Sequence, residues 1–365
     1  MSAEDATLLD DLKTHTYEEV AARHNVSRGK VYAVAVKHGA RKNEALIRER
    51  AIERKRRQRE FLEEAMNATQ TADVLDYLAG LPDDAVAMHL SSPPYNVAKS
   101  YGSGSSADQS RHFYYLGWML QVLSEMVRTL APGGTLFLQV GSTRGPDGGL
   151  YPLDCLLFQH LSNMGLTFHS RVCWVQPHGL TPKRRLAERY ETALVFSKGP
   201  QLVFNPTPAR MPQKQPSKRA FKGPNKGQLS GHPLGAFPSN VWHISNAGND
   251  RKDGVEGHPA QMPAELARRA ILLYTLPQDL VCDVFSGSGT THSECLRTGR
   301  GFTGCDLFYE DMRARRLEQV SPDLVTMRPG VTDESLAVWQ AEARIVEVPP
   351  NPNVDQIELF AAEAA

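Results

Sequence analysis

The chain has 365 residues, of which 41% are hydrophobic and 22% are charged, a composition typical of a globular protein. No apolar run is long enough to span a membrane, and the acidic N-terminus does not resemble a signal peptide. The formal net charge is zero, so the total charge does not indicate a nucleic-acid partner. The five cysteines form no CxxC pair, and this spacing argues against a metal site and predicts a cytoplasmic location.

Residues 16–38 predict two short helices joined by a tight turn. Thr16 and Glu19 form a capping box for the first helix, and Ser27 can cap the second. The pattern resembles a helix-turn-helix that binds DNA, although a small helical bundle without a DNA role would show it too. A charged helical stretch follows over 41–67, and its mixed signs suit a solvated, a connecting or a dimer-forming helix.

From about residue 70 the chain alternates between strand and helix patterns. Strands are expected at 85–90, 134–140, 166–175, 191–197, 280–285 and 301–305. Helices are expected at 113–130, 151–164, 262–276, 290–299 and 309–319. This alternation predicts an α/β fold with a doubly wound sheet.

The apolar run 85–90 ends abruptly in the sequence SSPPYN. Pro93 and Pro94 cannot donate to a sheet ladder, and they fix the backbone angle φ, so the strand must stop there. A strand end followed by an ordinary turn is the simplest interpretation. The alternative is a rigid platform carrying Tyr95 at the carboxyl edge of the sheet, where α/β folds place their chemistry.

A long basic segment separates the two halves of this pattern. No aspartate or glutamate occurs between Thr192 and Asn249, whereas lysines and arginines recur throughout. A solvated linker would have a similar Pro- and Gly-rich composition. Because a linker would normally carry some acids, we favour contact with nucleic-acid phosphates. The candidate phosphate-binding residues are Lys214, Lys218, Arg219, Lys222 and Lys226.

The segment 280–307 combines a buried strand, the loop SGSG, a helix start and a second strand ending in Asp306. Gly287 and Gly289 permit a close approach that a Cβ would prevent, so a ligand can lie over the loop against a helix N-terminus. An acid after the second strand is where doubly wound folds bind ribose hydroxyls. The loop lacks the full dinucleotide and P-loop fingerprints, so a ribose-bearing ligand without phosphates, such as S-adenosylmethionine, fits better.

The motifs SSPPYN, DVFSGSGTT and GCD together resemble those of the exocyclic-amino DNA methyltransferases. In that family an [S/D/N]-P-P-[Y/F/W] motif is catalytic, and a Phe-x-Gly-x-Gly loop binds S-adenosylmethionine. Two further runs are similar to family segments. In the first, 72–86, an acid, here Asp73, contacts the adenine of the cofactor. The second, the His-Pro-x-x-x-Pro run within 257–271, flanks the methionine end of the cofactor. The resemblance implies cofactor-binding roles for Asp73, His258, Pro259, Asp283, Phe285, Ser286, Gly287, Ser288, Gly289, Thr290 and Asp306.

The order of the motifs is similar to the permuted group of the family usually called β, in which target recognition lies between the catalytic and cofactor halves. We therefore expect a helical region over 1–67, a methyltransferase domain over 68–320 with a target-recognition insert at 200–256, and a C-terminal tail over 321–365. Dimers are common in that group, so a homodimer is a further expectation. The resemblance does not extend to the N-terminal region.

The resemblance implies transfer of a methyl group from S-adenosylmethionine to an amino group of a flipped base in double-stranded DNA, in restriction-modification or epigenetic marking in a prokaryote. The expected catalytic residues are Ser92, Pro93, Pro94 and Tyr95. Ser92 Oγ and the Pro93 carbonyl would accept the hydrogens of the amino group, and Tyr95 would stack on the base. No His or Glu is obviously placed to take the departing proton, so water or Ser92 itself is expected to do so.

Several alternatives follow from the same residues. A cytosine-C5 enzyme would need a cysteine nucleophile, typically after proline, and no Pro-Cys pair occurs. A small-molecule or rRNA methyltransferase would share the glycine loop, but the motif order and the basic segment disfavour it. A non-catalytic helix-turn-helix regulator is disfavoured by the intact motifs. Serine at the first position of the catalytic motif resembles the N4-cytosine enzymes, whereas aspartate is usual in N6-adenine enzymes, which remain the main alternative.

Overall fold

The computed structural model describes residues 3–12, 15, 17–27, 30–31, 34, 60–61, 63–101, 110–177, 182–183, 185–211, 213–232, 235–247, 257–320 and 344–347. The chain divides into two compact units, Met1–Phe61 and Leu62–Ala365, which are described separately. Within these residues, no helix combines the length and the apolar character needed to cross a membrane.

The first unit contains helices α1 (Ala3–Asp11) and α2 (Tyr17–Arg23). Their small buried core consists of Leu8, Leu12, Val20, Ala21, Val31 and Val34. Ser27 Oγ accepts a hydrogen bond from the Lys30 backbone N–H at 3.2 Å, the capping contact predicted for the second helix. Helix α1 was not predicted. Thr16 of the predicted capping box, and most of the charged stretch 41–67, lie outside the described residues.

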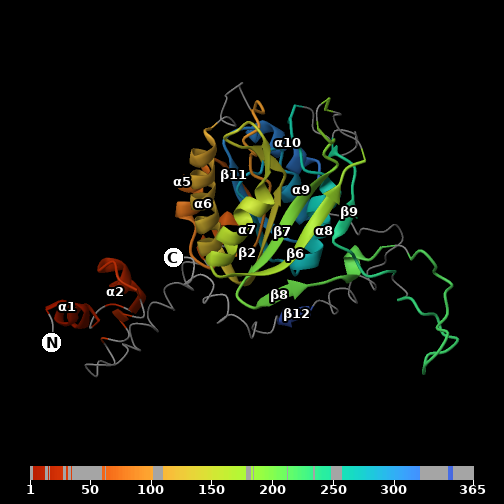
Figure 1. Cartoon of the computed structure of the whole chain (residues 1–365), viewed down its shortest axis with the longest axis horizontal. Coiled ribbons are helices and arrows are strands. Elements are labelled where there is room, and N and C mark those ends of the chain that lie inside the picture. Colours follow the sequence, from red (N-terminus) through yellow and green to blue (C-terminus); the bar gives the residue numbers. More distant parts are fainter. Residues whose placement is uncertain are drawn as a thin grey trace. The chain divides into compact units, whose positions relative to one another are not determined.

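The second unit is built on one mostly parallel sheet (Figure 1). In sheet order its strands are β1 (Ala68–Thr71), β11 (Gly301–Asp306), β10 (Leu280–Asp283), β2 (Val86–Ser91), β3 (Leu130–Val140), β7 (Tyr190–Lys198), β6 (Leu166–Val175) and β9 (Val241–His243). Every neighbouring pair is parallel except the two pairs that include β7. Two small antiparallel pairs lie outside this sheet, β4 (Ser142–Arg144) with β5 (Leu150–Pro152) and β8 (Gln201–Phe204) with β12 (Arg344–Glu347).

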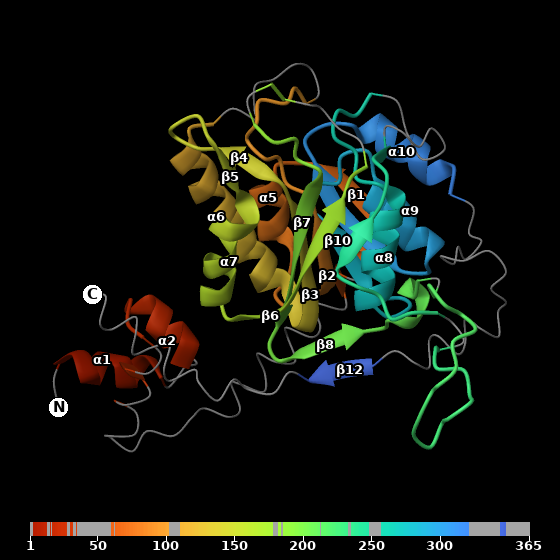
Figure 2. The same cartoon turned by 45° about the vertical axis from the view of Figure 1, so that its right-hand side comes forward.

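Helices cover both faces of the sheet, which confirms the doubly wound α/β architecture (Figure 2). One face carries α5 (Val74–Gly80), α6 (His112–Thr129) and α7 (Leu153–Asn163). The other carries α8 (Ala264–Tyr274), α9 (Thr290–Arg297) and α10 (Glu310–Glu318). A short 3₁₀ helix, η1 (Thr207–Ala209), packs beside α8.

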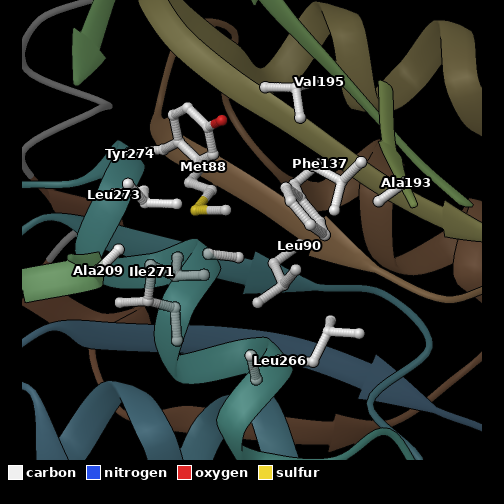
Figure 3. Close-up of a cluster of buried hydrophobic side chains, with 14 of the residues drawn as sticks. Met88, Leu90, Phe137, Ala193, Val195, Ala209, Leu266, Ile271, Leu273 and Tyr274 are labelled. Atoms are coloured by element: carbon white, nitrogen blue, oxygen red, sulfur yellow. The ribbon is translucent and has the colours of Figure 1, made fainter. Parts of the chain in front are cut away.

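The main hydrophobic core lies between the sheet and α8 (Figure 3). Met88 and Leu90 of β2 face Leu266 and Ile271 of the helix, and all four side chains are almost fully buried. Burying each such side chain contributes about 1.5–3 kcal/mol to stability. Trp242 belongs to this core, where its ring stacks on Phe137 at a centroid distance of 5.9 Å. The core therefore fixes β2 and α8, whose ends border the candidate site.

The central pairing of the sheet joins β2 to β10, where Met88 pairs with Val281 and His89 with Cys282. Parallel strands end at the same edge, so the SSPPYN motif after β2 and the glycine loop after β10 emerge side by side. Two predicted sequence motifs that are far apart in the chain are thus neighbours in the fold.

Candidate active site

A cavity of about 1360 Å³ opens at the carboxyl edge of β2 and β10. Its lining includes all four predicted catalytic residues, Ser92 to Tyr95. It also includes every predicted cofactor-binding residue except Gly289. The structure thus brings together residues that the sequence places in four separate segments, around 73, 92–95, 258 and 283–306.

The glycine loop has the left-handed backbone that its sequence predicts. Gly287 has φ +46° and Gly289 has φ +80°, a region that disfavours residues with a Cβ. Gly289 is the N-cap of α9, and a Cβ there would lie 3.3 Å from Arg313 Cγ, so this glycine shapes the turn rather than the cavity wall. Gly287 faces the cavity, and its N–H donates to Asp306 Oδ2 at 2.8 Å.

Asp283 connects the glycine loop to the catalytic strand. Its carboxylate accepts hydrogen bonds from Ser91 Oγ at 2.9 Å, Thr291 Oγ1 at 2.6 Å and the Phe285 backbone N–H at 3.1 Å. Ser91 Oγ in turn accepts from the Val284 backbone N–H at 3.2 Å. Burial raises the pKa of Asp283 to about 6, against the opposing effect of these donors. The network fixes the loop relative to the neighbouring SSPPYN motif.

The other two predicted cofactor acids also organise backbone. Asp306 accepts from the N–H groups of Gly287 and Phe308, one on each carboxylate oxygen. Burial raises the pKa of Asp306, and these two donors partly offset that shift. Asp73 caps α5 by accepting from the Leu75 N–H at 2.8 Å. Because a carboxylate has about four acceptor sites, each acid keeps capacity for a ligand.

His258 lies over the glycine loop in a ring of aromatic side chains. Its imidazole centroid lies 4.6 Å from that of Tyr309 and 6.2 Å from that of Tyr101. Burial, with smaller contributions from Arg316 and Lys99, lowers the pKa of His258 to about 4, so the ring is neutral at pH 7. Its Nδ1 accepts from the Ala260 N–H at 3.2 Å. These contacts pack the ring and tie it to the backbone at Ala260.

The SSPPYN turn is held rigidly by side chains from other elements. Tyr115 of α6 donates its hydroxyl to the Pro94 carbonyl at 2.7 Å. The ring of Tyr95 packs against Gly141, where a Cβ would lie only 2.8 Å from Cε2. Ser92 Oγ and the Tyr95 hydroxyl are 3.3 Å apart. These contacts limit how far the turn can reorganise.

Sequence reasoning missed Glu191, which lies at the start of β7 and lines the cavity. Tyr95 donates its hydroxyl to Glu191 Oε2 at 2.8 Å. Gln139 donates to the same oxygen at 2.5 Å, and Gln176 donates to Oε1 at 3.0 Å. The available signal was weak: Gln139 is a buried polar residue near the end of an apolar strand, and Glu191 opens another such strand.

Trp118, another residue missed by sequence reasoning, connects α6 to the glycine loop. Its ring contacts that of Phe285 edge to face, at a centroid distance of 5.9 Å. Trp118, Phe285 and Tyr115 all line the cavity. An aromatic wall of this kind suits a flat ligand such as a purine ring.

The predicted phosphate-binding residues lie elsewhere, on what we call the basic hairpin, residues 211–236. Antiparallel bridges between Met211 and Ala236 and between Arg219 and Leu229 hold it together. All five cations are exposed, and the Arg219 guanidinium also donates to the Gly227 carbonyl at 2.6 Å. None of the five lines the cavity.

The basic hairpin starts at the end of α8 remote from the cavity. Just before it, the Asn205 N–H donates to the carbonyl of Leu273, near the end of α8, whereas Met262, before the start of α8, lines the cavity. An 11-residue helix is about 16 Å long. Figure 2 shows the hairpin (green) extending beyond β8.

Comparison with known proteins gives a match to the family described as DNA methylase over residues 86–314. The type II methyltransferase M.BglII of Bacillus subtilis is 35% identical over 247 residues, which are 68% of this chain and 67% of that protein. The DNA adenine methyltransferase YhdJ of Escherichia coli strain K12 is 27% identical over 283 residues, 76% of this chain and 92% of that protein.

A solved structure titled PvuII DNA methyltransferase (cytosine-N4-specific) is similar to this chain with a TM-score of 0.53. The match covers 75% of this chain and 91% of that one, with 21% sequence identity. At this identity the likeness supports the fold.

Proposed function

The chain belongs to the N6/N4 DNA methylase family, and we propose that it methylates the N4 amino group of cytosine in double-stranded DNA. The observation that carries this proposal is Ser92, a neutral hydroxyl at the first position of the catalytic motif, in the cavity that the cofactor loop also lines. Cytosine-N4 enzymes of the family typically have serine there.

The methyl donor is S-adenosyl-L-methionine. The cavity fits it in three respects: a glycine, Gly287, whose Cβ would intrude on His258, two acids at the strand ends, and an aromatic wall. We propose that the Phe285–Thr290 loop holds its methionine portion with His258 and Pro259, and that Asp306 and Asp73 hold its ribose and adenine. When bound, it supplies an electrophilic methyl group on a positively charged sulfur.

The protein's own contribution to the reaction is to activate a poor nucleophile. The lone pair of a base amino group is delocalised into the ring. Ser92 Oγ and the Pro93 carbonyl, by accepting its two hydrogens, would favour a pyramidal nitrogen with a localised lone pair. Because Pro93 and Pro94 have fixed φ, and Tyr115 holds the Pro94 carbonyl, these acceptors need little reorganisation.

Tyr95 supplies the surface on which the flipped base stacks. A base inside the duplex cannot reach the cavity, so it must leave the helix first. The ring of Tyr95 packs against Gly141, and its hydroxyl is bound to Glu191, so its orientation is fixed before the base arrives. A prearranged stacking surface lowers the entropy cost of binding the base.

The basic hairpin would contact the duplex away from the target base. The segment that leads into it contacts the end of α8 remote from the cavity, through the Asn205 N–H and the Leu273 carbonyl, and none of the hairpin's five candidate cations lines the cavity. The cations would therefore bind phosphates flanking the recognition site. Exposed cations nearer the cavity, Lys183 and Arg185 between β6 and β7, offer a second set of phosphate contacts.

Mass spectrometry of nucleosides tests the target base. DNA incubated with the wild-type protein and S-adenosyl-L-methionine should yield N4-methylcytosine after digestion. N6-methyladenine, the expectation if the chain acts like the relative named as an adenine methyltransferase, would refute the cytosine proposal and leave the family assignment unchanged. C5-methylcytosine would contradict direct attack by an amino nitrogen.

Further parts of the proposal concern the cellular setting. Relatives named as type II methyltransferases support a role in bacterial restriction-modification, hence a cytoplasmic protein. We also propose the division into a helical region 1–67, a methyltransferase domain 68–320 with its 200–256 insert, and a tail 321–365. Four residues of that tail form β12 and pair with β8. A homodimer is part of the same proposal, and gel filtration with light scattering would test it.

A further inference from the structure

We propose that Glu191 is a positioning residue: acting through Tyr95, it compels Ser92 to accept, rather than donate, a hydrogen bond at the target amino group. The inference rests on the proposed amino-group methylation, but it does not depend on whether the base is cytosine or adenine. It arises from three side chains whose contacts fix the direction of every hydrogen bond between them.

Glu191 reaches the cavity because β7 is antiparallel to its neighbours. The parallel strands end at the catalytic edge, so β7 begins there, with Glu191 opposite Trp174 of β6. The carboxylate receives hydrogen bonds on both oxygens, from Gln176 on Oε1 and from Gln139 and Tyr95 on Oε2. The two glutamines lie on either side of β7, from the ends of β3 and β6.

The donors and acceptors can be assigned one by one. A carboxylate has no proton, so it can only accept, and the single proton of the Tyr95 hydroxyl must point toward Glu191. The Tyr95 oxygen is then left with lone pairs only. In the 3.3 Å contact between Tyr95 and Ser92, the serine must therefore be the donor. With its only proton directed at Tyr95, Ser92 Oγ presents lone pairs to the cavity.

This direction matters for the chemistry. The target amino group offers two N–H donors, and activation requires acceptors for both. A serine free to rotate could instead donate to the nitrogen lone pair, which is the pair that must attack the methyl group. Burial and the charge of Glu191 hold the pKa of Tyr95 well above its ordinary value, so the phenol keeps the proton that it donates. The two hydrogen bonds that link Ser92 to Tyr95 and Tyr95 to Glu191 thus keep one direction.

The test begins with Glu191→Gln, which keeps the size of the side chain. The amide is no longer an obligate acceptor: when its nitrogen faces Tyr95 and donates to it, Tyr95 donates to Ser92, so the hydrogen bonds lose their single fixed direction. Loss of one oriented transition-state hydrogen bond should lower kcat by about 10²-fold or more. Dissociation constants for S-adenosyl-L-methionine and for DNA should stay within about twofold of wild type, because no contact with either is removed.

A double-mutant cycle separates positioning from a structural role. Tyr95→Phe keeps the stacking ring and removes the hydroxyl that links Glu191 to Ser92. Glu191→Gln should therefore have little further effect on kcat in that background. Glu191→Asp, which retains a carboxylate, should recover part of the lost activity. The matched control is Glu318→Gln, an exposed carboxylate at the end of α10 that does not line the cavity, which should turn over like wild type.

Each result has a definite meaning. A Glu191→Gln variant with wild-type kcat, or an undiminished effect of Glu191→Gln in the Tyr95→Phe background, would overturn the inference. A wild-type product of N6-methyladenine would refute only the cytosine proposal, and the same cycle would then be run on adenine. A folded wild-type protein that transfers no methyl group to any DNA would overturn both proposals together.

Discussion

The Cα of Gly287 faces the imidazole of His258 so closely that a Cβ placed on it would lie 2.6 Å from Nε2. The same glycine has φ +46°, a conformation that costs other residues about 1–2 kcal/mol. The loop is therefore constrained by its own backbone and by the ring above it, on the side where the cofactor is proposed to lie.

Gly287→Ala should weaken cofactor binding at least tenfold, because the loop or His258 must move to accommodate the methyl group. Calorimetric titration with S-adenosyl-L-methionine measures this directly. Gly148→Ala is the matched control: Gly148 also has a positive φ, +78°, but a Cβ there would have no heavy atom within 4 Å. Equal affinities for wild type and Gly287→Ala would refute the assignment of this loop.

Ser92→Ala should lower kcat by about 10²–10³-fold and leave binding of DNA and cofactor nearly unchanged, because it removes one acceptor but not the Tyr95 platform. Ser91→Ala, one residue earlier, should act differently. Ser91 donates to Asp283 and accepts from Val284, so its loss should weaken cofactor affinity through the glycine loop. Single-turnover experiments give the rate of methyl transfer for both variants, and calorimetry gives their cofactor affinities. If Ser92→Ala and Ser91→Ala changed the rate and the affinity to the same extent, the separate roles would be contradicted.

Neutralising Lys214, Lys218, Arg219 and Lys222 to glutamine should weaken DNA binding and reduce its salt dependence. Each lost phosphate contact lowers the slope of log K against log salt by about 0.9. Fluorescence anisotropy with labelled duplex at several salt concentrations gives the slope. Cofactor affinity is the internal control, since none of these residues lines the cavity. If the variant showed the same salt slope as wild type, the basic hairpin would be a linker that does not contact phosphates.

Asp283 predicts a specific pH dependence of stability. Burial raises its pKa from 3.8 to about 6 in the folded state, so the folded protein binds more protons than the unfolded chain between these values. Its contribution to stability is therefore greatest below about pH 4 and is lost as pH rises through about 6. Over this range the loss amounts to about 3 kcal/mol, at about 1.4 kcal/mol per pKa unit.

Asp283→Asn isolates this contribution, because the amide oxygen can still accept from Ser91 and Phe285 while the Thr291 hydroxyl rotates to accept from the amide nitrogen. Urea unfolding of both proteins between pH 4.5 and 7.5 gives the difference in free energy of unfolding. The wild type should lose stability relative to the variant as pH rises. A difference that is constant with pH would show that the carboxyl group titrates normally.

The sequence predicted the parts of the fold that have a strong pattern. Every expected strand and helix from residue 85 to 319 is present, because long apolar runs and clear periodicity mark them. β1 and β9 escaped prediction, as they have only four and three residues and are partly exposed. α5, which has seven residues, was not predicted as a helix; the family resemblance singled out only Asp73, its N-cap.

For the candidate site, motifs located the residues that follow strands β2, β10 and β11, since parallel strands bring their ends together. Glu191 could not be found this way. It lies at the beginning of a strand, and only the antiparallel direction of β7 carries it to the same edge. The basic hairpin shows the converse: its charge was evident, but its position relative to the cavity depends on where α8 ends, which no local pattern specifies.

The pairing of β2 with β10 has a consequence for how the chain is made on the ribosome. Ser91 and Asp283, whose side chains join these strands, are 192 residues apart. At about 5–20 residues per second, the edge of β2 stays open for about 10–40 s, while β3, β7, β6 and β9 can already pair on its other side. During synthesis the nascent protein therefore exposes an apolar strand edge at its future catalytic centre, and chaperone occupancy should be highest before β10 emerges.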